Sequence, residues 1–139
     1  MNLHDMNELR YIDMEIKDYK DKILELRAMA ESMTANLSGM PHGGGNGGSK
    51  VERAAVAIVD YQKMIEDALC KRIEKSKKIH EYILGIDDAQ TRQIAYLRFV
   101  QSKSWGEVAK EIGGYNAPST VRSRIIRYIE KEEKEHGEK

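Results

Sequence analysis

Apolar residues recur at alternating intervals of three and four through the first third of the chain. They are Leu9, Ile12, Ile16, Tyr19, Ile23, Leu26, Ala30, Met33 and Leu37. This spacing is typical of a coiled coil, because residues three and four apart share one face of an α-helix. Most positions between them are charged, so an isolated helix would leave an apolar stripe in water. The pattern predicts a helix over about residues 2–37 that packs against a partner.

A second apolar stripe, within a helix predicted over about residues 50–84, supplies that partner. Its main positions are Val51, Ala55, Ile58, Gln62, Ile65, Leu69, Ile73, Ser76, His80 and Ile83, and Ala54, Val59, Tyr61, Ala68 and Ile79 widen it. The glycine-rich segment 38–49 predicts a flexible connector, because glycine opposes helix formation. Two helices of similar length with a short connector favour an antiparallel hairpin. The connector permits both closure within one chain and exchange of arms with a second copy.

The sequence changes character after Leu84. Gly85 suits the end of a helix, and Asp87 and Asp88 suit the N-terminal cap of the next one. We therefore place a domain boundary here, with the hairpin over residues 1–84 and a second domain over residues 85–139. Three further helices are predicted in the second domain, over about residues 88–101, 105–112 and 117–134. No segment shows the sustained two-residue alternation of a strand, so the predicted fold class is all-α.

Capping signals define the last two predicted helices. Ser104 and Glu107 have the spacing of a capping box, in which each side chain binds the other residue's free amide. Gly113 and Gly114 suit a left-handed helix end, and Pro118 suits the first turn of the next helix. A short helix, a glycine-containing turn and a longer helix together form the plan of a helix-turn-helix.

The three predicted helices have enough apolar residues for a small shared core. We expect Trp105 to pack over its edge, because a large ring at the start of a short helix is commonly placed there. The predicted inward residues are Ile94, Leu97, Val100, Val108, Ala109, Ile112, Val121, Ile125, Tyr128 and Ile129.

Charge is unevenly distributed along a chain whose net charge is zero. Residues 88–129 contain seven basic and three acidic side chains, so this block has a net charge of +4. A basic block in a neutral chain indicates a localised anionic partner. If Val121 points inward, the geometry of the helix turns hydroxyl and guanidinium groups outward. With Lys103, the predicted DNA-binding residues are Ser119, Thr120, Arg122, Ser123, Arg124 and Arg127.

Other classes of function find little support. Cys70 is the only cysteine, so a disulfide scaffold is excluded, and we expect its thiol to be buried or half-buried. The four histidines lack zinc-ligand spacing, so no metal or other cofactor is predicted. No nucleophile, base and orienting group converge, so we do not expect an enzyme. The sequence has no signal peptide and no apolar run long enough to span a bilayer, which indicates an intracellular protein without a membrane partner.

Four short segments of the C-terminal region have a recognisable pattern, namely residues 97–100, 104–109, 112–113 and 119–122. Through these segments the region resembles the fourth conserved region of bacterial sigma factors. The whole chain resembles small phage-encoded regulators of the ArpU and RinA kind. The resemblance implies a phage or prophage transcriptional regulator in the bacterial cytoplasm, associated with the nucleoid. It also implies promoter contacts through Ser119, Thr120, Arg122, Ser123 and Arg127. The other sigma regions are missing, so promoter melting is not implied.

Two alternatives to a DNA-reading regulator remain open. A DNA-recognition subunit of the small-terminase kind, used in phage DNA packaging, also joins a helix-turn-helix to helical hairpins. An adaptor that binds host RNA polymerase without reading DNA would also account for the sigma-like end. In the favoured hypothesis the coiled coil forms a homo-oligomer, and the helix over residues 117–134 of each copy reads one half-site.

Overall fold

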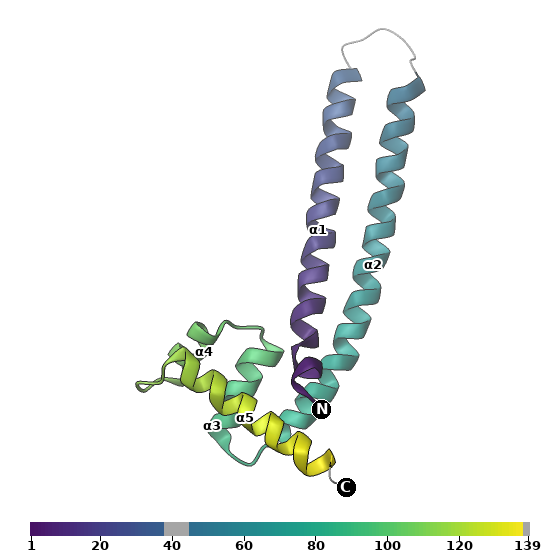
Figure 1. The fold of residues 1–139 in the computed structure, drawn as a ribbon. Coiled ribbons are helices and arrows are strands. Elements are labelled where there is room, and N and C mark those ends of the chain that lie inside the picture. The colour runs from purple at the N-terminus through teal and green to yellow at the C-terminus, as the bar shows by residue number, and fades with distance from the viewer. Residues whose placement is uncertain (38–44, 138–139) are drawn as a thin grey trace. The chain divides into compact units, whose positions relative to one another are not determined.

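The computed structural model describes residues 1–37 and 45–137 of the chain. All regular structure in this part is helical, which confirms the predicted all-α fold. Figure 1 shows the helices in chain order. Their bounds are α1 Leu3–Leu37, α2 Gly45–Leu84, α3 Ala89–Ala95, the π-helical turn η1 Tyr96–Val100, α4 Trp105–Ile112 and α5 Pro118–Gly137.

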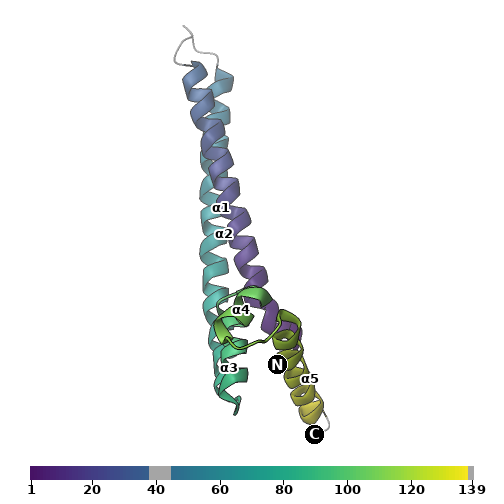
Figure 2. The same cartoon turned by 90° about the vertical axis from the view of Figure 1, so that its left-hand side faces the viewer.

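Helices α1 and α2 pack against each other as a hairpin. Figures 1 and 2 show them side by side from two directions. The predicted stripe of α1 faces inward, since each of its positions from Leu9 to Met33 is buried or half-buried. The hairpin therefore forms because each helix covers the apolar side of the other.

The chain divides into two compact units that differ from the predicted domains. Unit 1 contains residues 1–12 and 72–139, and unit 2 contains residues 13–71. The predicted boundary at residue 85 instead separated the whole hairpin from the C-terminal helices. The start of α1 and the end of α2 belong to unit 1, because their apolar side chains are buried in the same core as those of α3 to α5.

Unit 2 contains the rest of the hairpin, from residue 13 of α1 to residue 71 of α2. Ile16 and Ile23 of α1 are buried, as is Ala68 of α2. The rings of Tyr19 and Tyr61 lie 6.0 Å apart across the two helices. Within each helix these residues share one face through their three- and four-residue spacing. The two faces meet across the hairpin, as expected for a coiled coil.

The predicted register of α2 is partly wrong. Residues expected at the centre of its stripe are exposed, with Leu69 44% and Ile73 70% accessible, and Ala55, Gln62 and His80 are exposed as well. Residues expected only to widen the stripe are buried, namely Ala54, Ala68 and Ile79. The buried side of α2 recurs at three- and four-residue intervals through Ala54, Ile58, Tyr61, Ile65 and Ala68. The exposed residues Ala55, Gln62 and Leu69 each follow one of these positions, so they form a second stripe beside the first. Only the first stripe faces α1.

The predicted connector is also partly wrong. Residues 45–49 form the start of α2, whereas the expected connector ran to residue 49. Residues 38–44 lie outside the described part of the chain. Extension of a helix toward its N-terminus adds hydrogen bonds, because each added carbonyl accepts one from the amide four residues ahead. These hydrogen bonds offset the low helix propensity of glycine.

The core of unit 1 combines side chains from the start of α1 and the end of α2 with those of the C-terminal helices. All the residues predicted to point inward are buried or half-buried there. This core has further members that the sequence did not assign to it. These are Met6, Leu9, Ile79, Ile83, Ile86, Ala95 and Phe99, each at most 3% exposed. Apolar burial at this level is the main stabilising term for so small a unit.

The predicted helix over residues 88–101 is divided between α3 and η1. Asp88 caps α3, because its carboxylate accepts hydrogen bonds from the Thr91 hydroxyl at 2.6 Å and the Thr91 amide at 2.9 Å. These bonds, the hydroxyl bond first, hold the pKa of Asp88 below its usual value. After the π-helical turn, Ser102 takes a φ of 54°. This turn directs the chain into α4.

Candidate nucleic-acid interface

The predicted capping box at the start of α4 is present. The Glu107 amide donates to the Ser104 hydroxyl at 3.2 Å, and the Ser104 amide donates to the Glu107 carboxylate at 3.3 Å. Each side chain thereby satisfies an amide that has no partner within the helix. The beginning of α4 is thus defined by local sequence, and it coincides with the predicted residue 105.

The turn between α4 and α5 depends on two glycines. Gly113 and Gly114 take φ values of 77° and 69°, which side chains with a Cβ rarely adopt. The ψ of Gly113 is −169°, so this residue lies in a positive-φ region that is essentially restricted to glycine, and not in the left-handed helical region as predicted. The Asn116 side chain donates to the Gly113 carbonyl at 3.2 Å and closes the turn. Helix α5 then begins at Pro118, one residue after the predicted start.

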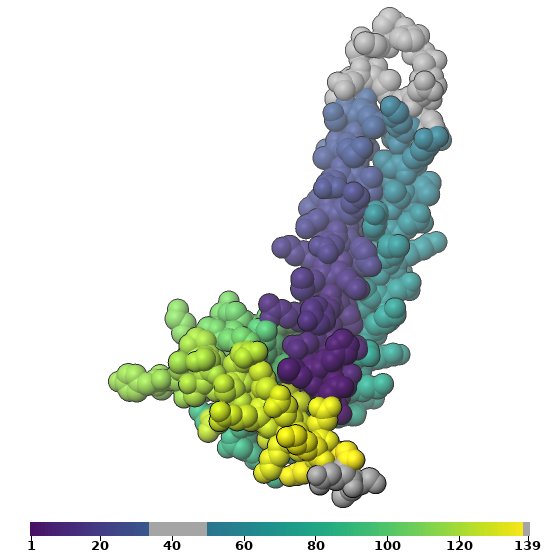
Figure 3. All heavy atoms as spheres, in the orientation of Figure 1, coloured from purple at the N-terminus to yellow at the C-terminus, as the bar shows by residue number. Residues whose placement is uncertain are grey.

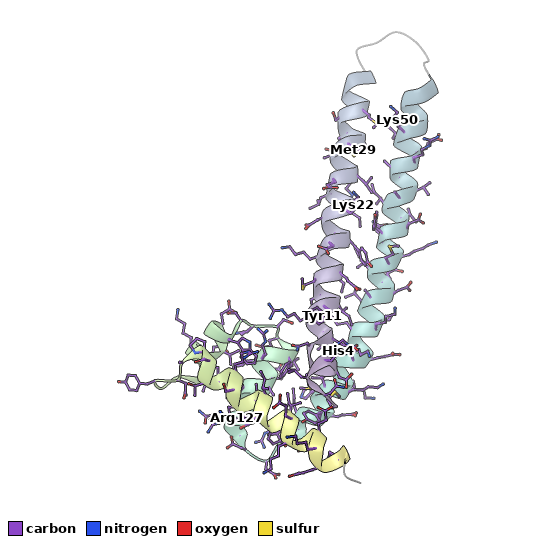
Figure 4. The ribbon with its side chains drawn as sticks, in the orientation of Figure 1. His4, Tyr11, Lys22, Met29, Lys50 and Arg127 are labelled. Carbon is purple, nitrogen blue, oxygen red and sulfur yellow. The ribbon has the colours of Figure 1, made fainter. Side chains whose placement is uncertain are left out.

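Helix α5 has one apolar side and one polar side. Val121, Ile125 and Ile129 are at most 2% exposed and belong to the core of unit 1. The predicted DNA-binding residues of this helix lie on its other sides. Ser123 is half-buried, and the exposed ones are Ser119, Thr120, Arg122, Arg124 and Arg127. Figure 4 labels Arg127 on α5, and Figure 3 shows the atoms of α5 on the surface of unit 1.

An open depression runs along the polar side of α5. Hydroxyl, amide and guanidinium groups line most of it, which makes it suitable for a polar or anionic partner. The lining residues are Gln90, Asn116, Ser119, Thr120, Val121, Ser123, Arg124 and Arg127. The structure therefore brings together five of the seven predicted site residues.

Arg124 is held by α3. Its guanidinium donates to the Gln90 side chain, and its charge contributes to the lowered pKa of Asp88. The sequence did not predict this contact, since Gln90 and Arg124 are 34 residues apart. Arg124 is thus positioned before any ligand binds, which lowers the entropic cost of using it in recognition.

Lys103 differs from the arginines of α5. Its ammonium forms an ion pair with the Glu111 carboxylate of α4. It does not line the depression along α5. The charge of Lys103 is therefore offset by a neighbour in this conformation.

Sequence reasoning did not single out Arg98. Its guanidinium lies 4.4 Å from the centre of the Trp105 ring, and its Nη1 donates to the Lys103 carbonyl at 2.9 Å. Trp105 packs over the core edge as predicted, and its ring meets that of Phe99 edge to face at 6.5 Å. Burial lowers the pKa of Arg98, and the charges of Arg10 and Arg122 lower it further. The sequence signal for these contacts is weak, because Arg98 is a single charged residue between the apolar residues Leu97 and Phe99.

Side chains suited to other chemistry are dispersed. Cys70 is exposed, so the prediction of a buried or half-buried thiol is wrong. It follows Leu69, which lies on the stripe of α2 that does not face α1. Among the described residues, no group of three or more histidine, cysteine, aspartate and glutamate side chains is arranged to hold a metal ion. No described helix combines the length and apolarity that a bilayer crossing requires.

Comparisons with protein families, with curated proteins and with solved structures find no match to this chain.

Proposed function

We propose that this protein binds double-stranded DNA and that α5 enters the major groove. One observation carries the proposal. The apolar side of α5 is buried in the core of unit 1, while its hydroxyl and arginine side is exposed after a short helix and a glycine turn. This is the arrangement in which a helix-turn-helix presents its second helix to DNA.

The side chains of α5 suit different parts of a duplex. Arg122 and Arg127 are exposed and have planar guanidinium groups, which bind guanine or phosphate through two hydrogen bonds. Ser119 and Thr120 are small enough to let the helix approach base edges closely, and their hydroxyls bind bases or phosphates. The N-terminus of α5 adds the positive end of a helix dipole. Arg124, held by Gln90, is positioned to contact the flank of the groove.

The specific role that we propose is transcriptional regulation in a phage or prophage. This part of the proposal rests on the sigma-like residues of α4 and α5, which include the Ser104 cap and Trp105. Both residues have structural tasks here, since one caps α4 and the other covers the core. A DNA-binding regulator of this kind would act in the bacterial cytoplasm at the nucleoid.

We further propose that two copies act together. The outer stripe of α2 leaves Ala55, Val59 and Leu69 exposed, and with Gln62 and Glu66 they recur at intervals of four, three, four and three residues. A second copy of the hairpin would cover these side chains, as symmetric dimers commonly do. A dimer also supplies two recognition helices for two half-sites. Solution mass measured by light scattering tests this part, and a monomer at all concentrations contradicts it.

The DNA-binding proposal is tested by titrating the protein into a fluorescent duplex library made from DNA near its own gene, at several salt concentrations. The double variant Arg122→Ala and Arg127→Ala should lose roughly tenfold or more in affinity, since each good arginine contact contributes about 1–3 kcal/mol. The slope of log affinity against log salt should also become shallower by about one per lost phosphate contact.

A matched control removes the same charge from the same helix. The double variant Lys131→Ala and Lys134→Ala changes two exposed cations near the end of α5, where acidic residues surround them. It should bind DNA nearly as well as the unaltered protein. Absent or salt-insensitive DNA binding by the unaltered protein overturns the proposal. Binding of RNA polymerase without DNA binding would support the adaptor alternative.

A further inference from the structure

The depression along the polar side of α5 is bordered by a second helix. Most residues that line it belong to α5 and to the turn before α5, but Gln90 belongs to α3. Helices α3 and α5 contact each other within unit 1 (Figure 1). Gln90 is the second residue of α3, and its side chain is half-buried. The depression therefore has lining groups from two elements that are far apart in sequence.

The side chains of Gln90 and Arg124 are joined by a hydrogen bond between the two helices. Nη1 of Arg124 donates to Oε1 of Gln90. A guanidinium group has five N–H donors in one plane, so this bond leaves the Nε and Nη2 edge of Arg124 for a second, bidentate contact. The amide nitrogen of Gln90 adds two further donors beside it. The pair thus presents several donors at one place on the surface.

Arg124 lies on the flank of α5. Successive residues of an α-helix are about 100° apart, so Arg127 projects about 160° away from the buried Ile125, and Arg124 only about 100° away. Arg127 therefore points opposite to the core, whereas Arg124 lies beside α3. When a helix occupies the major groove, the two sugar–phosphate strands border it on either side. The position of Arg124 therefore favours a phosphate over a base edge.

The charge of Arg124 is held in place without being neutralised by its hydrogen-bond partner. The partner is the neutral amide of Gln90, and Arg124 is exposed. Asp88, on which the charge of Arg124 acts, accepts its hydrogen bonds from the hydroxyl and the amide of Thr91. An arginine that is already held loses less conformational freedom on binding than one that is free.

We propose that Gln90 and Arg124 together bind one backbone phosphate at the edge of the groove that α5 occupies. In this site Arg124 contacts two phosphate oxygens through Nε and Nη2. Gln90 is a positioning residue, which holds Nη1 of Arg124 and adds an amide donor. The inference rests on the proposed function and extends the interface to α3, from which no DNA contact was predicted.

The variant Gln90→Met tests the site in the full chain, because methionine has a similar length and lacks the amide. Affinity for the fluorescent duplex should fall about two- to tenfold, since Arg124 must then be ordered during binding. The slope of log affinity against log salt should not change, because no charge is lost. Arg124→Ala should instead make this slope shallower by about one. The melting temperature of Gln90→Met should stay within about 3 °C of the unaltered protein.

The double variant Gln90→Met and Arg124→Ala distinguishes positioning from a general effect on the fold. Its loss of affinity should be smaller than the product of the two single losses, because Gln90 acts mainly through Arg124. Single losses that simply multiply would contradict the coupling of the two side chains.

Gln93→Met is the matched control, because Gln93 is an exposed glutamine of the same helix and does not line the depression. It should leave affinity and salt slope unchanged. Duplexes with a single uncharged methylphosphonate linkage locate the phosphate. One such linkage should weaken binding by the unaltered protein and have little further effect on Arg124→Ala. If no linkage behaves in this way, the phosphate site is wrong.

Failure of this site is distinguishable from failure of the proposed function. If Gln90→Met binds every duplex like the unaltered protein while the double variant of Arg122 and Arg127 does not, the phosphate site is refuted and the proposed function stands. A loss confined to duplexes with one particular base pair indicates base recognition and refutes the phosphate site as well. Absent DNA binding by the unaltered protein overturns both.

Discussion

Gly113 is the residue whose backbone most directly determines how α5 follows α4. Its φ of 77° and ψ of −169° lie in a region that is essentially restricted to glycine. A Cβ added there would meet no atom within 4 Å. Any cost of substitution at Gly113 therefore comes from the backbone and not from a steric clash.

We expect Gly113→Ala to destabilise unit 1 by about 1–3 kcal/mol, because alanine must adopt a strained conformation. Thermal or urea denaturation followed by circular dichroism measures this change. Gly106→Ala is the control within α4, where an added Cβ lies 3.9 Å from the Ser104 hydroxyl. It should stabilise the helix by up to about 1 kcal/mol. Equal effects of the two substitutions contradict the role of the turn.

Residues that interact with near neighbours in sequence were the most predictable. The Ser104 and Glu107 pair and the Asp88 cap involve partners three residues away. The contact between Arg124 and Gln90 was not predictable, because only folding brings these side chains together.

Helix α2 has two stripes of similar spacing, and only one of them is buried. Ile79 is 1% exposed and Ile73 is 70% exposed, although both are isoleucines of the same helix and the same unit. The inner stripe faces α1, and the outer stripe is exposed. Periodicity alone does not distinguish them, because both have the same spacing.

The two isoleucines provide a direct test of this register. Ile79→Ala should lower the free energy of unfolding by about 2–5 kcal/mol, as deletion of a fully buried side chain does. Ile73→Ala should change it by no more than about 0.5 kcal/mol in the monomer. Chemical denaturation of both variants at low protein concentration measures the difference. The reverse order would restore the register expected from sequence.

At the scale of the whole molecule, the C-terminal helices share one core with the start of α1 and the end of α2. This core includes Met6 and Leu9 from α1 and Ile79 and Ile83 from α2, all at most 3% exposed. A segment that begins at residue 85 lacks all four side chains. A core that loses this much apolar burial is expected to be marginal.

We therefore expect a chain that lacks residues 13–71, with residues 12 and 72 joined by a short glycine–serine linker, to unfold cooperatively. A fragment over residues 85–139 should melt at a clearly lower temperature or without a cooperative transition. Circular dichroism and calorimetry of the two chains measure this difference. A fragment as stable as the shortened chain would show that the ends of the hairpin are dispensable.

The order of helices, the bounds of α4 and the polar side of α5 follow from the sequence by itself, because caps, glycine turns and helical periodicity act over a few residues. Tertiary structure alone decided which stripe of α2 is buried, that the start of α1 and the end of α2 complete the core of unit 1, and that Arg124 contacts Gln90. These outcomes depend on competition between surfaces for the same apolar partner. Such competition is resolved only when the elements pack together.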